Sequence, residues 1–339
     1  MVAMSLAALA VLVACGPAQT AQPTPSGVGN AVRSGRDLRC SLPVIVGTRV
    51  GFVDFPAGKF RQDPDAPNPA QHFGLAYSFG AKRWVPTGYA YGWQLLSPDG
   101  RYLVVGQRPP AYSGPVQSPV AGATEIDQID VVTGAGTKIG SVPGSARVIA
   151  WGKDGIYLES FPGAPATGVV LRLDPATGRS VQLGPGTGPP GSYVWFWVTS
   201  AAVWASLFPG PNQSDQNPVL SLSHGSIRQW YVSPATRSVS ILGFVTPSEP
   251  LVVEFNREPY DRMTGMAFML LAAPNVTQSV KLDPAIIAWG VTDTFGVWLE
   301  APGRVWLYDS AGLVKMADLS SSIGSAMPGV VGPCGDVAS

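Results

Sequence analysis

Charged and histidine side chains are scarce in this sequence of 339 residues. Asp, Glu, Lys and Arg make up 13% of the chain, the formal net charge is zero, and histidine occurs twice. Nucleic-acid binding needs Lys and Arg clustered against the phosphates, so composition disfavours that class of function. Two histidines, His72 and His224, are too few for a histidine-rich metal centre.

The motifs of several enzyme classes are also missing. No glycine-rich phosphate loop precedes a helix, and no nucleophile-elbow pattern supports Ser-His-Asp catalysis. No uninterrupted stretch has the 3.6-residue periodicity of an amphipathic helix. His224 lies in the turn-like segment 223–226, where a plain turn residue is favoured over a catalytic one. The sequence therefore leaves the catalytic residues unknown and predicts no metal ligands.

The first fifteen residues are apolar or small and end at a cysteine. The run stops at Leu12-Val13-Ala14-Cys15 and is followed at once by Gly, Pro, Thr and Gln. Fourteen residues are too few to span a bilayer, which takes about 20, but they suit the apolar region of a signal peptide. One interpretation is a signal peptide without lipid, cut near Ala14. The alternative is carried by the cysteine, because the pattern resembles the lipobox of bacterial lipoproteins.

That resemblance implies how the chain is organised and where it lies. Residues 1–14 would be the signal peptide, and Cys15 would carry the lipid that anchors the protein outside the cytoplasm on the bacterial cell membrane. Residues 15–38 are rich in Pro, Gly and Ser and are expected to form a flexible tether spanning on the order of 25 Å. Residues 39–334 are then the folded domain.

A pattern of four short strands recurs along that domain. In one copy the expected strands are 147–151, 156–160, 169–174 and 179–183, joined by one long and two tight connections. In the first copy they are 42–46, 50–53, 73–79 and 82–85, and the second copy begins with a strand at 91–96. The first tight turns fall near residues 48, 99, 154, 200, 248 and 294. Four strands at a period of about 50 residues are typical of a β-propeller blade.

Short turn motifs point in the same direction. The hairpin Ser97-Pro98-Asp99-Gly100 and the Asp-x-x-Thr-Gly turns at 130–134 and 174–178 resemble those of Tol-type and WD-type bacterial propellers. The resemblance covers about residues 40–333 and implies an all-β fold, a β-propeller with six four-stranded blades, but no activity. Seven blades and tandem β-sandwiches are the alternatives.

Two cysteines remain beside Cys15, and they flank the folded domain. Outside the cytoplasm, Cys40 and Cys334 are expected to form a disulfide, which a ring closing end to end would bring together. A bridge closing a loop of this length contributes roughly 5 kcal/mol in the chain-entropy description. The alternative is a pair of buried free thiols.

The expected connections between second and third strands are long, whereas the opposite turns are tight. Because long loops on a rigid scaffold concentrate binding residues, we expect ligand binding on the long-loop face. The candidate residues there are Asp63, Asp65, His72, Arg108, Tyr112, Asn212, Asp215, Asn217, Arg257, Glu258, Tyr260, Asp261 and Arg262. The alternative for the dense group at 256–262 is a solvated loop whose charges pair with one another. No cofactor is evident, although the acidic loops leave calcium open.

Tryptophans within the apolar strands allow two interpretations. Trp93, Trp151 and Trp289 fall in expected first strands, and Trp204, Trp298 and Trp306 in second or third strands. Packing between blades is favoured over an aromatic platform for carbohydrate.

The sequence therefore predicts a monomeric, membrane-anchored binding or scaffolding module for a protein or an envelope glycan. The alternative is a propeller enzyme, a hydrolase or lyase acting on a sugar or lactone with or without calcium. Such an enzyme would need several polar side chains converging on the central channel.

Overall fold

The computed structural model describes residues 33–34, 38–72, 74–88, 92–107, 122–162, 168–186, 194–206, 217–256, 264–283 and 285–336. The fold described here belongs to the unit Val32–Ser339. Regular structure in the described ranges is almost entirely strand. It also includes one short helix, α1 (Ser320–Ile323), and two short 3-10 helices, η1 (Pro69–Gln71) and η2 (Gly92–Leu95). None of these helices is long and apolar enough to cross a membrane.

The strands of the described ranges form seven sheets, in which neighbouring strands are antiparallel apart from one parallel pair. Three sheets have four strands in chain order. They are β10 (Ser145–Gly152), β11 (Gly155–Phe161), β12 (Val169–Leu173) and β13 (Ser180–Pro185); β14 (Val194–Val198), β15 (Val203–Ser206), β16 (Pro218–Ser223) and β17 (Ser226–Val232); and β18 (Arg237–Thr246), β19 (Glu249–Asn256), β20 (Thr264–Ala273) and β21 (Val276–Val280).

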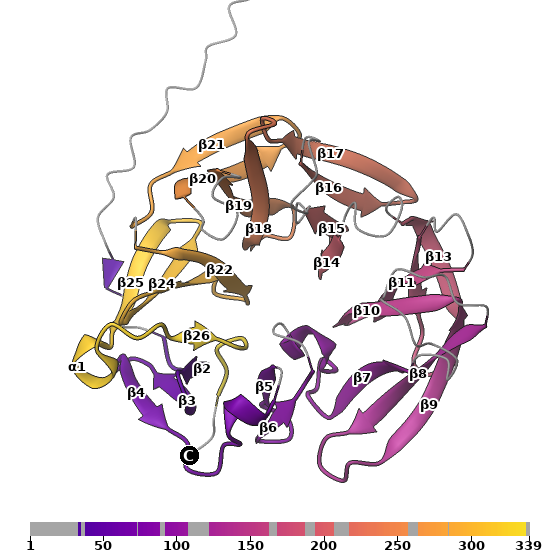
Figure 1. Ribbon diagram of the computed structural model, residues 1–339, viewed down its shortest axis with the longest axis horizontal. Coiled ribbons are helices and arrows are strands. Elements are labelled where there is room, and N and C mark those ends of the chain that lie inside the picture. Colours follow the sequence, from indigo (N-terminus) through magenta and orange to yellow (C-terminus); the bar gives the residue numbers. More distant parts are fainter. Residues whose placement is uncertain are drawn as a thin grey trace, which may run out of the picture. The chain divides into compact units, whose positions relative to one another are not determined.

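The last meander has a further strand at its outer edge. It consists of β22 (Ile287–Thr292), β23 (Val297–Ala301), β24 (Arg304–Asp309) and β25 (Gly312–Asp318), with β1 (Arg33–Ser34) parallel to β25. Figure 1 shows the sheets arranged radially around a common centre, with β10, β14, β18 and β22 innermost and β13, β17, β21 and β25 outermost. This arrangement is a β-propeller, as the repeats predicted.

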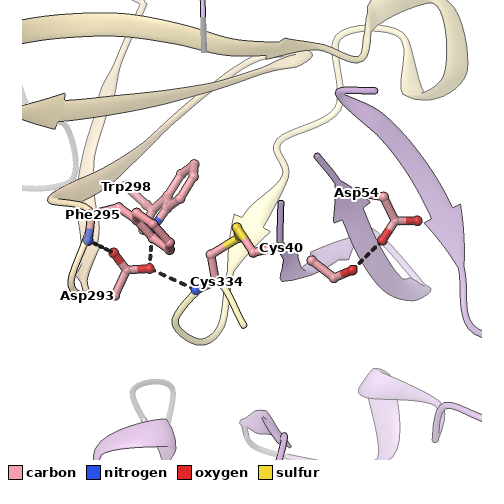
Figure 2. Close-up of a disulfide and its surroundings, with 7 residues drawn as sticks. Cys40, Asp54, Asp293, Phe295, Trp298 and Cys334 are labelled. Carbon is pink, nitrogen blue, oxygen red and sulfur yellow. Dashed lines mark hydrogen bonds between the residues drawn. A yellow bond between two sulfur atoms is a disulfide. The ribbon is translucent and has the colours of Figure 1, made fainter. Parts of the chain in front are cut away.

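The first sheet combines strands from both ends of the folded domain. Its order is β26 (Gly329–Val330), β2 (Ser41–Val46), β3 (Arg49–Asp54) and β4 (Lys59–Gln62). β26 is antiparallel to β2, with Val44 opposite Val330. The Cys40–Cys334 disulfide joins the same two segments, with Cα atoms 5.6 Å apart (Figure 2). The predicted disulfide is therefore confirmed, and the interpretation as free thiols is wrong.

The first two predicted repeats differ from the observed pairing. β4 lies between the strands predicted at 50–53 and 73–79 and pairs with β3, whereas β5 (Leu75–Ser78) and β6 (Arg83–Pro86) form a two-stranded sheet of their own. β4 was missed because its residues are mostly exposed and form no apolar run. The strand predicted at 91–96 is replaced by η2 and a single bridge from Leu96 to Leu103. The neighbouring sheet contains β7 (Tyr102–Gln107), β8 (Ala123–Asp130) and β9 (Gly136–Pro143).

Apolar side chains fill the spaces between adjacent sheets. Trp298 of β23 is fully buried in a cluster that also contains Leu42 and Val44 of β2 and the disulfide. Trp204 and Trp306 are 1% and 7% exposed, so the packing interpretation is confirmed for these three tryptophans. Large rings suit the wedge between radial sheets because each buries a large apolar area. Trp93 and Trp151 are half-buried and pack against two such clusters.

Candidate functional site

A cavity of about 380 Å³ lies where the innermost strands end. Its lining includes Trp151 at the end of β10, Val198 at the end of β14, Phe244 near the end of β18 and Thr292 at the end of β22. Each of these strands turns tightly into the second strand of its sheet. The cavity therefore occupies the central mouth on the tight-turn face, opposite the long-loop face on which the sequence predicted binding.

Aromatic side chains form much of the cavity wall. They come from several sheets and connections: Tyr77, Phe79, Trp93, Trp151, Trp197 and Phe244. Ring contacts hold some of them in place, with centroids 5.0 Å apart for Tyr77 and Phe79 and 5.9 Å apart for Trp197 and Phe244. Trp93, Trp151 and Trp197 are only half-buried, which leaves part of each side chain facing open space.

The hydroxyl groups in the cavity lining are engaged in holding turns. Ser78 Oγ donates to the carbonyl of Gly100, and Ser97 Oγ accepts from the N–H of Tyr102 at 2.9 Å. Thr199 Oγ1 accepts from Trp204 Nε1 at 3.1 Å, and Thr292 Oγ1 accepts from the N–H of Phe244 at 2.9 Å.

The charge of the lining comes from one carboxylate. Asp99 is exposed, and its Oδ1 accepts from Ser97 Oγ at 2.5 Å and from the N–H of Arg101 at 3.0 Å. The hydrogen bond from Ser97 is the main cause that lowers the pKa of Asp99 below its usual value. The described lining residues include no Lys, Arg or His.

Asp99 also borders a second, outer groove. This groove is lined by Arg101 and Asp130, which form an ion pair at 3.3 Å, together with the turn residues Gly80, Ala81, Val132 and Thr133. Arg83 Nη1 also reaches this groove, where it donates to the carbonyl of Val132 at 3.1 Å, so charges of both signs border it.

Four of the candidate residues predicted from the sequence lie in the described ranges, and none of them lines the cavity. Asp63 accepts from Trp84 Nε1 at 2.9 Å and from the N–H of Asp65 at 3.0 Å, which ties the segment after β4 to β6. His72 caps η1 and is half-buried. Asn217 is fully buried and donates to Ser238 Oγ at 3.1 Å, so it joins two sheets.

The remaining predicted candidates lie outside the described residues. They are Arg108, Tyr112, Asn212, Asp215, Arg257, Glu258, Tyr260, Asp261 and Arg262, together with the lipidation residue Cys15. The long-loop face therefore stays a prediction. Within the described ranges no three His, Cys, Asp or Glu side chains form a group that could hold a metal ion.

Sequence reasoning missed the cavity because it assigned tryptophans in first strands to the core. A more specific signal was present. Trp151, Trp197 and Phe244 each lie within three residues of the tight turn that ends a first strand. In a radial arrangement, the ends of inner strands converge on the centre, so aromatic residues repeated at this position predict a shared aromatic wall.

Two carboxyl groups, the buried Glu300 and the half-buried Asp293, hold the C-terminal segment instead of lining the cavity. Asp293 Oδ2 accepts from the N–H of Cys334 at 2.8 Å and from Trp298 Nε1 at 2.6 Å (Figure 2). Glu300 accepts from the N–H of Val330 in β26 at 2.7 Å. Burial raises the pKa of Asp293 and raises that of Glu300 to about 8. These hydrogen bonds attach the C-terminal segment, which belongs to the first sheet through β26, to the last sheet.

No family model and no curated protein matches the chain. Among solved structures, the β-propeller domain of the Trilobed protease from Pyrococcus furiosus is 13% identical, with a TM-score of 0.42 over 66% of this chain and 69% of that one. An oligogalacturonate lyase from Vibrio parahaemolyticus is 10% identical, with a TM-score of 0.43 over 84% of this chain and 80% of that one.

The acylaminoacyl peptidase of Pyrococcus horikoshii is 12% identical, with a TM-score of 0.44 over 84% of this chain. This chain spans about half the length of that peptidase, 46% of it. Similarity at this level concerns the fold and says nothing about substrate or activity. The chain is thus similar to β-propeller proteins of several different functions.

Proposed function

We propose that this chain is a ligand-binding β-propeller that works outside the cytoplasm, tied to the membrane through Cys15. The observation that carries the binding role is the aromatic-walled cavity at the central mouth. Its volume of about 380 Å³ lies in the range of small-molecule sites, which are mostly apolar with a few placed polar groups. The location rests on the sequence pattern that ends at Cys15.

The cavity suits part of a larger ligand, such as a segment of an envelope glycan or of a protein. It opens on the tight-turn face, where the connections of the inner strands are too short to cover it. Half-buried tryptophans provide rigid, amphipathic contact area at a low cost in conformational entropy. A group that enters the cavity would therefore contact Trp93, Trp151 and Trp197.

An enzyme is the second candidate, because side chains from several sheets converge on this central position, as catalysis there would require. In the described lining Asp99 is the carboxylate that could act as an acid or base. Glycoside hydrolysis by the usual mechanisms uses a pair of carboxyl groups, so a second one would have to come from the ligand or from residues outside the described ranges.

A binding and turnover experiment separates the two candidates. The full chain would be titrated with fragments of envelope glycans, with and without calcium, while tryptophan fluorescence and the melting temperature are recorded and the products analysed. A ligand at 100 times its Kd stabilises the folded state by about 2.7 kcal/mol.

Trp151→Ala should abolish the stabilisation, whereas Phe60→Ala should leave it unchanged. Phe60 is a half-buried aromatic residue in β4 that does not line the cavity. A ligand that binds equally well to both variants would refute the proposed site, and release of cleaved product would establish the enzyme instead.

A further inference from the structure

We propose that the group held in this cavity is a quaternary ammonium cation, such as the trimethylammonium head of a choline-bearing ligand. The inference rests on the proposed function, because it specifies the chemistry of the same site.

The first argument is charge. In the described lining Asp99 is ionised at neutral pH, and Lys, Arg and His are absent. The outer groove beside it carries charges of both signs, since Asp130 pairs with Arg101 and Arg83 donates to the carbonyl of Val132. The charge contributed by the described lining itself is therefore negative, which favours a cation over an anion.

The second argument is the nature of the walls. Trp93, Trp151 and Trp197 contribute half-buried indole rings, and Tyr77, Phe79 and Phe244 complete the aromatic lining. The face of an aromatic ring is the negative part of its quadrupole, and tryptophan attracts cations most strongly. Aromatic residues from separate sheets around one space are the arrangement with which proteins hold quaternary ammonium groups.

The third argument is that the serine and threonine hydroxyl groups of the lining are engaged within the protein, so its remaining non-aromatic polar side chains are Gln94 and Asp99. The hydroxyls of Ser78, Ser97, Thr199 and Thr292 are already engaged within the protein. Trp93 Nε1 is buried from solvent, so it is not presented to a ligand in the open cavity. A primary ammonium group would bring three N–H donors, and each one left without an acceptor costs about 1–3 kcal/mol.

A quaternary ammonium avoids that cost because it has no N–H donor. Its methyl groups can lie against the rings, while its charge is compensated by Asp99 and by the ring faces. The cavity is of the size that holds a small-molecule ligand. Because Asp99 also lines the outer groove, the rest of a larger ligand can extend from the cavity into that groove.

The test compares choline with 3,3-dimethylbutan-1-ol, an uncharged molecule of the same shape, by calorimetric titration of the full chain. Choline should bind about tenfold more tightly, as expected for a partly desolvated cation over aromatic rings. Asp99→Asn should weaken choline binding several-fold and leave the alcohol unchanged. Asparagine Oδ1 can still accept from Ser97 and Arg101, so the turn is retained. The matched control is Glu125→Gln, because Glu125 is an exposed carboxylate that pairs with Lys138 away from the cavity.

The outcomes distinguish this inference from the proposed function. Equal affinity for choline and the alcohol, or choline binding that survives Trp151→Ala, would overturn the cation site. If choline does not bind but a glycan fragment binds in a Trp151-dependent manner, the proposed function stands and the cation inference fails. If neither binds, both fail. Preference for choline that depends on both Asp99 and Trp151 would support both.

Discussion

Glu300 should make the stability of this protein fall as the pH rises from acidic to mildly basic values. The side chain is 7% exposed and accepts one hydrogen bond, from Val330. Burial disfavours the charged form and raises the pKa to about 8, compared with 4.5 for an exposed glutamate. A proton held this firmly in the folded state couples folding to pH.

The sign of the effect follows from the two pKa values. Below about pH 4.5 Glu300 is protonated in both the folded and the unfolded state, so its favourable contribution is fully present. Between pH 4.5 and pH 8 only the unfolded state releases the proton, and the free energy of unfolding falls by about 1.4 kcal/mol for each pH unit. Above about pH 8 the contribution is lost, a total of about 5 kcal/mol as an upper figure.

Urea denaturation of the wild type and of Glu300→Gln between about pH 5 and pH 8.5 measures this coupling. The glutamine Oε1 can still accept from Val330, so the variant removes titration while keeping the acceptor. Asp293, whose pKa is raised in the same direction, is present in both proteins and cancels in the comparison. The difference in unfolding free energy between the two proteins should change steadily with pH. Parallel pH profiles for wild type and Glu300→Gln would refute the reasoning.

Three further predictions concern packing and cross-linking. Replacing Cys40 and Cys334 with serine should lower the unfolding free energy by up to about 5 kcal/mol, because the bridge closes a loop with a sequence separation of 294; an unchanged urea midpoint would contradict this. Trp298→Ala should lower the unfolding free energy by about 3–5 kcal/mol, because the ring is fully buried. A loss below about 1 kcal/mol in thermal unfolding would show that the surrounding residues fill the space left by the ring. Arg147→Ala removes the ion pair at 2.7 Å to Glu159, which is 1% exposed, and should lower the unfolding free energy by about 3–5 kcal/mol. Changing Glu159 to Leu as well should partly restore the stability. A failure of that second change to restore stability in urea would point to packing by Arg147 instead.

Much of the fold could be predicted because its repeats are local. The strands expected at 156–160 and 169–174 match β11 and β12, since tight turns and runs of β-branched residues lie next to each other in the sequence. The fold was harder to predict where partners are distant. β26 is two residues long and acquires its identity as a strand from β2, so no local pattern reveals it.

The candidate site was only partly predictable, for a geometrical reason. Trp298 and Trp151 have the same kind of sequence environment, an apolar strand beside a turn, yet one is sealed between sheets and the other faces the central cavity. Which environment applies depends on the distance of each strand from the centre. Asp99 was assigned to a hairpin turn, a role that it has, and only the position of η2 beside the inner strands places it at the cavity as well.

The placement of β26 also sets the order in which this fold can be completed. β2 is made early but receives its inner neighbour only after every other strand has been made. Until then its inner edge exposes unpaired backbone groups at Val44 and Ile45, which are able to join a strand of another chain. A chain interrupted before residue 329 would keep that edge permanently open. The first sheet is therefore completed only when the chain has been made past β26.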